Sequence, residues 1–73
     1  GQGAQAAEVL KAYLNTTPDD LHARTYLAVL LLENGAEEEG VSALEYVLER
    51  DPDHEEALQV VVDLQQATQG DET

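Results

Sequence analysis

The chain repeats itself with a period of 34 residues, and this feature limits its possible folds more than any other. The two prolines, Pro18 and Pro52, stand one period apart. The same shift superimposes identical or chemically similar residues: Gly1 on Gly35, Leu10 on Leu44, Leu14 on Leu48, Ala23 on Ala57, Leu27 on Val61 and Leu30 on Leu64. A period of this length indicates stacked supersecondary units that share a continuous core.

Local signals divide each period into two helices. Pro18 and Pro52 follow the capping residues Thr17 and Asp51, and proline suits the first helical position because the N–H it lacks would have no partner there. Apolar residues then recur at helical spacing, and Gly35 marks a helix end because glycine readily adopts the left-handed conformation. We expect one domain over residues 1–69, with helices at about 3–15, 18–34, 37–50 and 52–69, and a disordered tail over 70–73.

Composition favours helices and excludes several functions. Alanine and leucine, both strong helix formers, supply 21 of the 73 residues. Three basic residues against 16 acidic ones give a net charge of −13, so we expect no nucleic acid and no anionic membrane as a partner. The longest apolar run, Leu27 to Leu32, is too short to span a bilayer. We expect a soluble protein, with the cytoplasm as the default compartment.

The sequence offers little chemistry for catalysis or for a bound group. It has no cysteine, and its only serine, Ser42, lies within an apolar helical segment. His22 and His54 stand near helix starts, where histidines are usually solvated. The acidic segment 51–56 lacks the central glycine of a calcium-binding loop, and no glycine-rich phosphate loop precedes a helix. We therefore expect no enzyme, no cofactor and no metal.

Residues 21–54 resemble one complete tetratricopeptide repeat, a helix-turn-helix unit of the same 34-residue length. The resemblance rests on residues at the family's characteristic small, bulky and turn positions: Leu27, Ala28, Leu31, Gly35, Gly40, Leu44, Val47, Asp51 and Pro52. Arg24 departs from the pattern, since it stands at the family's loosely kept tryptophan site, where it weakens one core contact without arguing against the fold. Residues 1–20 and 53–69 resemble the flanking half repeats. The resemblance implies an all-α fold of four antiparallel helices in a right-handed superhelical stack.

The resemblance also implies a site. In this family the first helix of each repeat lines a concave face that binds peptides, which here would contain His22, Thr25, Val29, Leu32, Glu33, Gln59, Asp63 and Gln66. These positions hold no lysine and no asparagine, so a clamp for a peptide's terminal carboxylate is not expected. We expect a non-enzymatic interaction or scaffolding module that binds a short apolar or basic protein segment. Alternatively, Val29 and Leu32 could simply complete the core.

Other readings stay open. The chain could be a structural cap of a longer array without a binding role, since Val62 stands where the last helix would need a small residue to pack closely on a following helix. A metal-binding or enzymatic domain is a third interpretation. The face of Ala6, Ala7 and Leu10 could receive upstream repeats or a second copy. The acidity could steer a basic ligand, or it could be an adaptation to high salt as in halophilic proteins.

Overall fold

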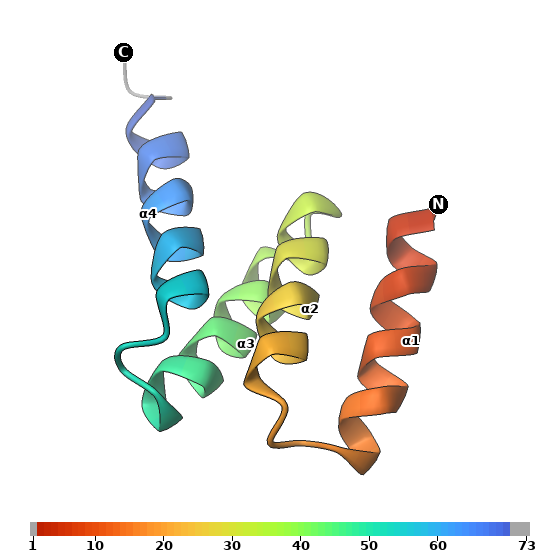
Figure 1. The fold of residues 1–73 in the computed structure, drawn as a ribbon. Coiled ribbons are helices and arrows are strands. Elements are labelled where there is room, and N and C mark those ends of the chain that lie inside the picture. The colour runs from red at the N-terminus through yellow and green to blue at the C-terminus, as the bar shows by residue number, and fades with distance from the viewer. Residues whose placement is uncertain (1, 71–73) are drawn as a thin grey trace.

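The structure, a computed structural model, describes residues 2–70 and folds them into four helices (Figure 1). They are α1 (Gln2–Thr16), α2 (Leu21–Glu33), α3 (Glu37–Arg50) and α4 (Glu55–Gly70). No strand occurs among these residues, and the predicted all-α fold is confirmed. Residues 71–73 of the predicted tail lie outside the described residues, and residue 70 is the last of α4.

The helices form a thin two-layer stack. Helices α1 and α4 lie at its two edges with α2 between them, and α3 crosses behind α2 (Figure 1). Helix α2 contacts each of the other three, and α3 also contacts α4. The front layer therefore consists of α1, α2 and α4, and α2 is the element that holds the stack together.

Two side chains, one repeat apart, cap the starts of α2 and α4. The carboxylate of Asp20 accepts a hydrogen bond from the backbone N–H of Ala23 at 3.0 Å, and Nδ1 of His54 accepts one from Ala57 at 3.2 Å. The helices therefore begin at Leu21 and Glu55, later than the predicted starts at residues 18 and 52. The two prolines lie in the preceding turns, because the capping side chains of Asp20 and His54, two residues after each proline, satisfy the first helical N–H groups.

Helix α2 ends as the sequence predicts. Gly35 has a φ of +84°, a conformation that side chains other than glycine rarely adopt. The N–H of Gly35 donates to the carbonyl of Leu32 at 3.2 Å, and the N–H of Ala36 donates to the carbonyl of Leu31 at 2.8 Å. This pair of bonds is a Schellman motif. It satisfies two terminal carbonyls of α2 and turns the chain into α3.

The buried apolar side chains form two clusters, one on each side of α2. The first joins α1 to α2, and the second joins α2 to α3 and α4. In the second cluster a Cβ added at Gly40 would lie 2.7 Å from Cγ of Leu32 and 3.2 Å from the carbonyl oxygen of Ala28. Helices α2 and α3 therefore approach each other closely at Ala28 and Gly40.

Arg24, at the family's tryptophan site, packs through its guanidinium group. That group lies 3.7 Å from the ring centre of Tyr46, and the guanidinium of Arg50 lies 3.4 Å from it. Two groups this close must occupy opposite faces of the ring. Arg24 Nη2 and Tyr46 Oη also donate to the carbonyl of Pro18, at 3.2 and 3.4 Å. This stack ties the turn before α2 to α3, at the position where the family places an aromatic ring.

Candidate functional site

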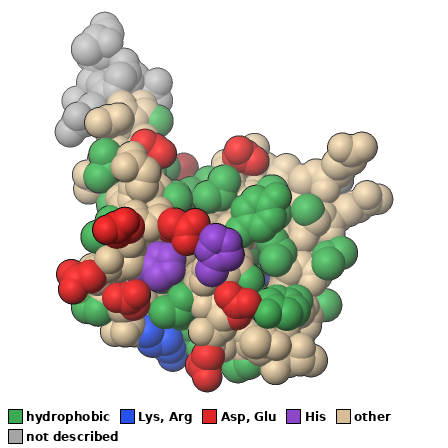
Figure 2. Space-filling view, in the orientation of Figure 1, with side chains coloured by type: hydrophobic (Ala, Val, Ile, Leu, Met, Phe, Trp, Pro, Cys, Tyr) green, Lys and Arg blue, Asp and Glu red, His purple; other side chains and the backbone are tan. Residues whose placement is uncertain are grey.

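A groove between α2 and α4 is the candidate functional site. It encloses about 270 Å³, and its described lining is mostly apolar, with a carboxylate from each helix: Val29, Leu32 and Glu33 of α2, and Val60, Asp63 and Leu64 of α4. Helices α2 and α4 present this face to the viewer, where hydrophobic, acidic and histidine side chains lie side by side (Figure 2). The groove exists because α3 holds α4 beside α2 without filling the space in front.

The structure brings four of the eight predicted site residues into this groove. These are Val29, Leu32, Glu33 and Asp63. Val29 and Leu32 are half-buried, so they contribute to the core and to the groove together. Thr25 is a correction: its side chain is buried, and its hydroxyl donates to the carbonyl of Leu21 at 2.8 Å. Because that bond turns the hydroxyl back onto its own helix, Thr25 adds nothing to the open surface.

The other three predicted residues are exposed but do not line the groove among the described residues. Gln59 donates from Nε2 to the carboxylate of Asp63 at 3.0 Å, which orients that carboxylate at the groove wall. Gln66 lies exposed toward the C-terminal part of α4. His22 lies at the first turn of α2, where it contacts α4.

Sequence reasoning missed three residues of this face. Val60 and Leu64 complete the apolar lining, and their spacing of four residues, which places them on one side of α4, was the available signal. Glu56 is the third, and it stands one repeat after His22. Shifting His22 by the 34-residue period would have found it, as the same shift pairs other concave positions.

His22 and Glu56 join α2 to α4 at one end of the face. Nδ1 of His22 lies 2.7 Å from Oε1 of Glu56, and both side chains are more than half exposed. The hydrogen bond to Glu56 raises the pKa of His22 above its ordinary value, and the charges of Glu56 and Asp20 add to the effect. The hydrogen bond from Tyr13 and the backbone N–H of Ala23 lower the pKa of Asp20.

The groove carries negative charge without a cation of its own. The three basic side chains of the chain are engaged elsewhere: Lys11 forms ion pairs with Glu8 and Glu39 at 3.4 and 3.3 Å, and both arginines stack on Tyr46. No lysine or arginine is among the described groove residues. A free carboxylate would therefore be repelled here, whereas a basic group would be attracted.

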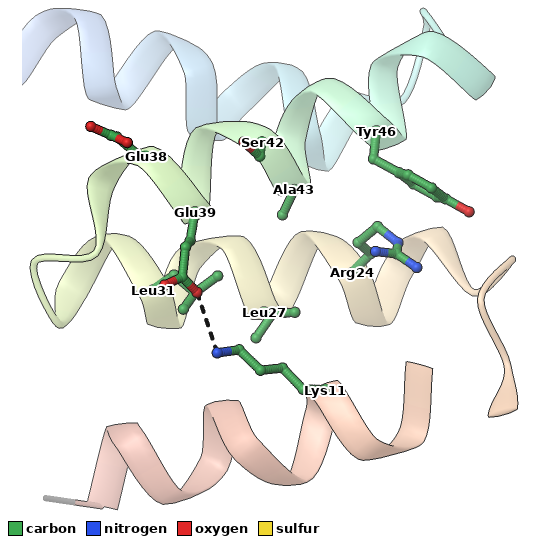
Figure 3. A pocket seen from close by; sticks show the side chains of 9 residues that line it. All are labelled: Lys11, Arg24, Leu27, Leu31, Glu38, Glu39, Ser42, Ala43 and Tyr46. Carbon is green, nitrogen blue, oxygen red and sulfur yellow. Dashed lines mark hydrogen bonds and ion pairs between the residues drawn. The ribbon is translucent and has the colours of Figure 1, made fainter. Parts of the chain in front are cut away.

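A second, larger hollow lies between α1, α2 and α3 and encloses about 500 Å³ (Figure 3). Leu27, Leu31 and Ala43 lie at its base. Lys11 reaches across it to Glu39, and Arg24 points toward Tyr46 (Figure 3). Lys11 and Glu39 therefore already satisfy each other in this hollow, whereas Nε of Arg24, which also lines it, is buried without a hydrogen-bond partner among the described residues.

Of the residues considered for chemistry, His54 and Asp51 form hydrogen bonds at the start of α4 and in the turn before it. Ser42 lines the second hollow, which contains neither histidine among its described residues. His54 caps α4, and the carboxylate of Asp51 accepts the N–H of Asp53 at 3.3 Å. Among the described residues no three His, Asp or Glu side chains cluster closely enough to hold a metal ion. None of the described helices combines the length and the apolarity that crossing a lipid bilayer requires.

Antiparallel helix pairs that recur every 34 residues, with a groove between equivalent helices, define an α-helical repeat protein. The chain belongs to the tetratricopeptide repeat family, whose model matches residues 1–64. No curated protein and no solved structure matches the chain significantly. Members of this family generally mediate protein–protein interaction or scaffolding and are generally not enzymes.

Proposed function

We propose that the chain is a non-enzymatic interaction module that binds a short protein segment in the groove between α2 and α4. The segment presents apolar side chains to the groove and carries basic residues beside them. The observation that carries the proposal is the lining itself: four aliphatic side chains between two carboxylates, Glu33 and Asp63.

The apolar part of the lining supports a contact that excludes water. Val29 and Leu32 on α2 face Val60 and Leu64 on α4, and all four are half-buried. At about 25 cal/mol per Å² of apolar surface removed from water, a few leucine-sized side chains in such a groove stabilise a complex by several kcal/mol before the entropy of association is subtracted. An amphipathic helix with apolar residues three or four positions apart matches this shape.

The charged part of the lining selects among apolar segments. Glu33 and Asp63 are exposed at the groove walls, and the whole chain adds a field of net charge −13. A lysine or arginine beside the apolar residues meets an acidic group there, which speeds association, whereas an acidic segment is repelled.

Fluorescence anisotropy tests the proposal with three labelled helical peptides that share one leucine pattern. Lysine, glutamine or glutamate flanks that pattern in the three peptides. We expect the lysine peptide to bind most tightly, the glutamine peptide more weakly, and the glutamate peptide not measurably. The affinity for the lysine peptide should fall with added salt because screening weakens exposed charge pairs.

A matched pair of charge variants connects the binding to the groove. Glu33→Gln with Asp63→Asn should weaken the lysine peptide several-fold and flatten its salt dependence. Glu45→Gln with Glu49→Gln removes the same charge from α3, which supplies none of the described groove residues, and should change the affinity much less. Equal losses of affinity in the two double variants would show that only the net charge of the chain matters. If none of the peptides binds, the chain is better explained as a structural cap without a ligand.

A further inference from the structure

The two helices at the edges of the stack expose apolar side chains that the clusters do not use. On α1, Val9 is 69% exposed and Tyr13 is 42% exposed; on α4, Leu58 is 41% exposed and Val62 is 42% exposed. Their neighbours Ala6 and Leu10 on α1 pack against the first cluster, and Val60 and Val61 on α4 pack against the second. Each edge helix therefore buries one apolar side and leaves a second apolar side open.

The face predicted for upstream repeats or self-association is only partly open in this structure. Ala7 is buried against α2 in the first cluster, and Ala6 and Leu10 are half-buried there. The open side of α1 is centred instead on Val9 and Tyr13. We call the pair Val9 and Tyr13 the α1 edge and the pair Leu58 and Val62 the α4 edge.

The internal repeat shows what kind of helix each edge is shaped to contact. A shift of 34 residues places Val9 on Ala43 and Tyr13 on Val47, which are buried in the second cluster, where α3 packs on α2. The α1 edge thus repeats the side with which α3 packs on α2.

The α4 edge corresponds to the side that α2 contributes to the α2–α3 contact. The shift places Val62 on Ala28, which is fully buried in the second cluster, and Leu58 on Arg24, which stacks on Tyr46 of α3. The exposed side of α4 therefore corresponds to the side of α2 that packs on α3. The exposed side of α1 corresponds to the side of α3 that packs on α2.

Both edges lie outside the most acidic part of the chain. Twelve of the 16 acidic residues fall between positions 19 and 56. Helix α1 holds one acid and one base, Glu8 and Lys11, which pair with each other at 3.4 Å. From residue 57 to its end, α4 holds a single acid, Asp63, at the groove. Two copies of a chain with net charge −13 repel each other least where these edges meet.

We propose that a second copy of this chain binds head to tail, with the α1 edge of one copy packed on the α4 edge of the next. The contact repeats the α2–α3 pairing between molecules. Val62 and Ala6 are larger than Ala28 and Gly40 at the corresponding positions, so the two helices stand farther apart than α2 and α3. Because the two surfaces differ, each copy keeps one free edge and chains of copies can grow.

One helix–helix contact is a small interface, so we expect weak association that depends on concentration. Sedimentation velocity in about 1 M KCl, where the screening length is about 3 Å, removes most of the charge repulsion. The chain itself should sediment as species that grow past the dimer as its concentration rises. Val9→Asp and Val62→Asp each block one edge, and each variant alone should stay monomeric.

Mixing the two blocked variants gives the decisive result. The Val62→Asp chain keeps its α1 edge and the Val9→Asp chain keeps its α4 edge, so an equimolar mixture should form dimers and nothing larger. Tyr26→Asp, which changes an exposed aromatic residue of α2, should leave self-association unchanged. Circular dichroism should show unaltered helix content for all three variants, since the replaced side chains are exposed.

Three outcomes would overturn the proposal. The first is an unmodified chain that stays monomeric at every concentration, which would leave these edges to a different partner. The second is a single blocked variant that still dimerises alone, which would mean that like edges pair symmetrically. The third is a mixture of folded variants that fails to form dimers.

Discussion

Nδ1 of His22 lies 2.7 Å from Oε1 of Glu56, and the two residues are 34 positions apart in the chain. They occupy the same position in two successive repeats, at the first turns of α2 and α4. The contact therefore joins equivalent points of neighbouring repeats on the face that carries the groove. It also couples the spacing of α2 and α4 to the protonation of one histidine.

This pair predicts a pH dependence. The pKa of His22 is raised by Glu56, so the folded chain binds the proton more tightly than the unfolded chain does. The pair's contribution to stability is present in full below the unfolded value of about 6.5 and is lost as the pH rises through the raised pKa. An NMR titration of the His22 ring should show a lower pKa in Glu56→Gln. In the control Glu55→Gln, which removes the same charge one residue away, the change should be smaller; equal pKa values in all three chains would contradict the contact.

The close approach at Gly40 predicts that added volume destabilises the fold. Gly40→Ala places a methyl group 2.7 Å from Leu32 Cγ, and overpacking of this kind costs about 1–3 kcal/mol. The higher helix propensity of alanine offsets up to about 1 kcal/mol of that. Urea unfolding should therefore show a net loss of about 1 kcal/mol. Gly3→Ala is the control, because the three atoms nearest to its added methyl group, at 3.2 to 3.6 Å, all belong to the side chain of Asn34. Equal stability of the two variants would contradict a destabilising contact at Gly40.

The guanidinium stack predicts that Tyr46 contributes more to stability than its exposure suggests. Tyr46→Leu keeps an apolar side chain but removes the ring that lies between Arg24 and Arg50. Each cation–π contact is worth about 0.5–1 kcal/mol near a surface, so the expected loss is about 1–2 kcal/mol. Tyr26→Leu makes the same change at a ring that is 55% exposed and should have little effect. Similar denaturation midpoints for the two variants would exclude a stabilising stack.

Charge repulsion predicts a response to salt. Thermal melts followed by circular dichroism should give a higher Tm in about 1 M KCl than in about 0.1 M, because the screening length falls from about 10 to about 3 Å. Glu45 and Glu49 are exposed and four residues apart on α3, a spacing at which like charges destabilise a helix. Glu45→Gln should raise the Tm at low salt and reduce its dependence on salt. A Tm that does not change with salt would contradict an adaptation of the acidic residues to high salt and would favour their role in attracting a basic ligand.

The repeat made the fold predictable, because its period, its glycine and its small residues determine how the helices pair. The helix starts were harder to predict. Pro18 and Thr17 give a plausible cap, but Asp20 competes and forms the bond to Ala23. His54 caps α4 through a ring nitrogen, and histidine is not among the residues expected at that position. Only the structure shows which of two nearby capping groups is used.

The groove was predictable in part, for a related reason. Val29, Leu32, Glu33 and Asp63 followed from positions that the family uses. Thr25 was predicted from the same set of positions but is buried, because whether a threonine faces solvent or bonds its own helix depends on how closely the next helix packs. Val60 and Leu64 belong to the groove because α4 turns them toward α2, and that rotation is determined by tertiary packing.

The central claim is that a basic, apolar segment binds between α2 and α4, and NMR locates such binding directly. The isotope-labelled chain would be titrated with the lysine-flanked leucine peptide while the backbone amide shifts are followed. We predict saturable shifts concentrated at Val29, Leu32, Val60 and Leu64, with little change along the outer side of α3 at Glu45. Saturable shifts that cluster on α1 or α3 and spare the groove would contradict the account.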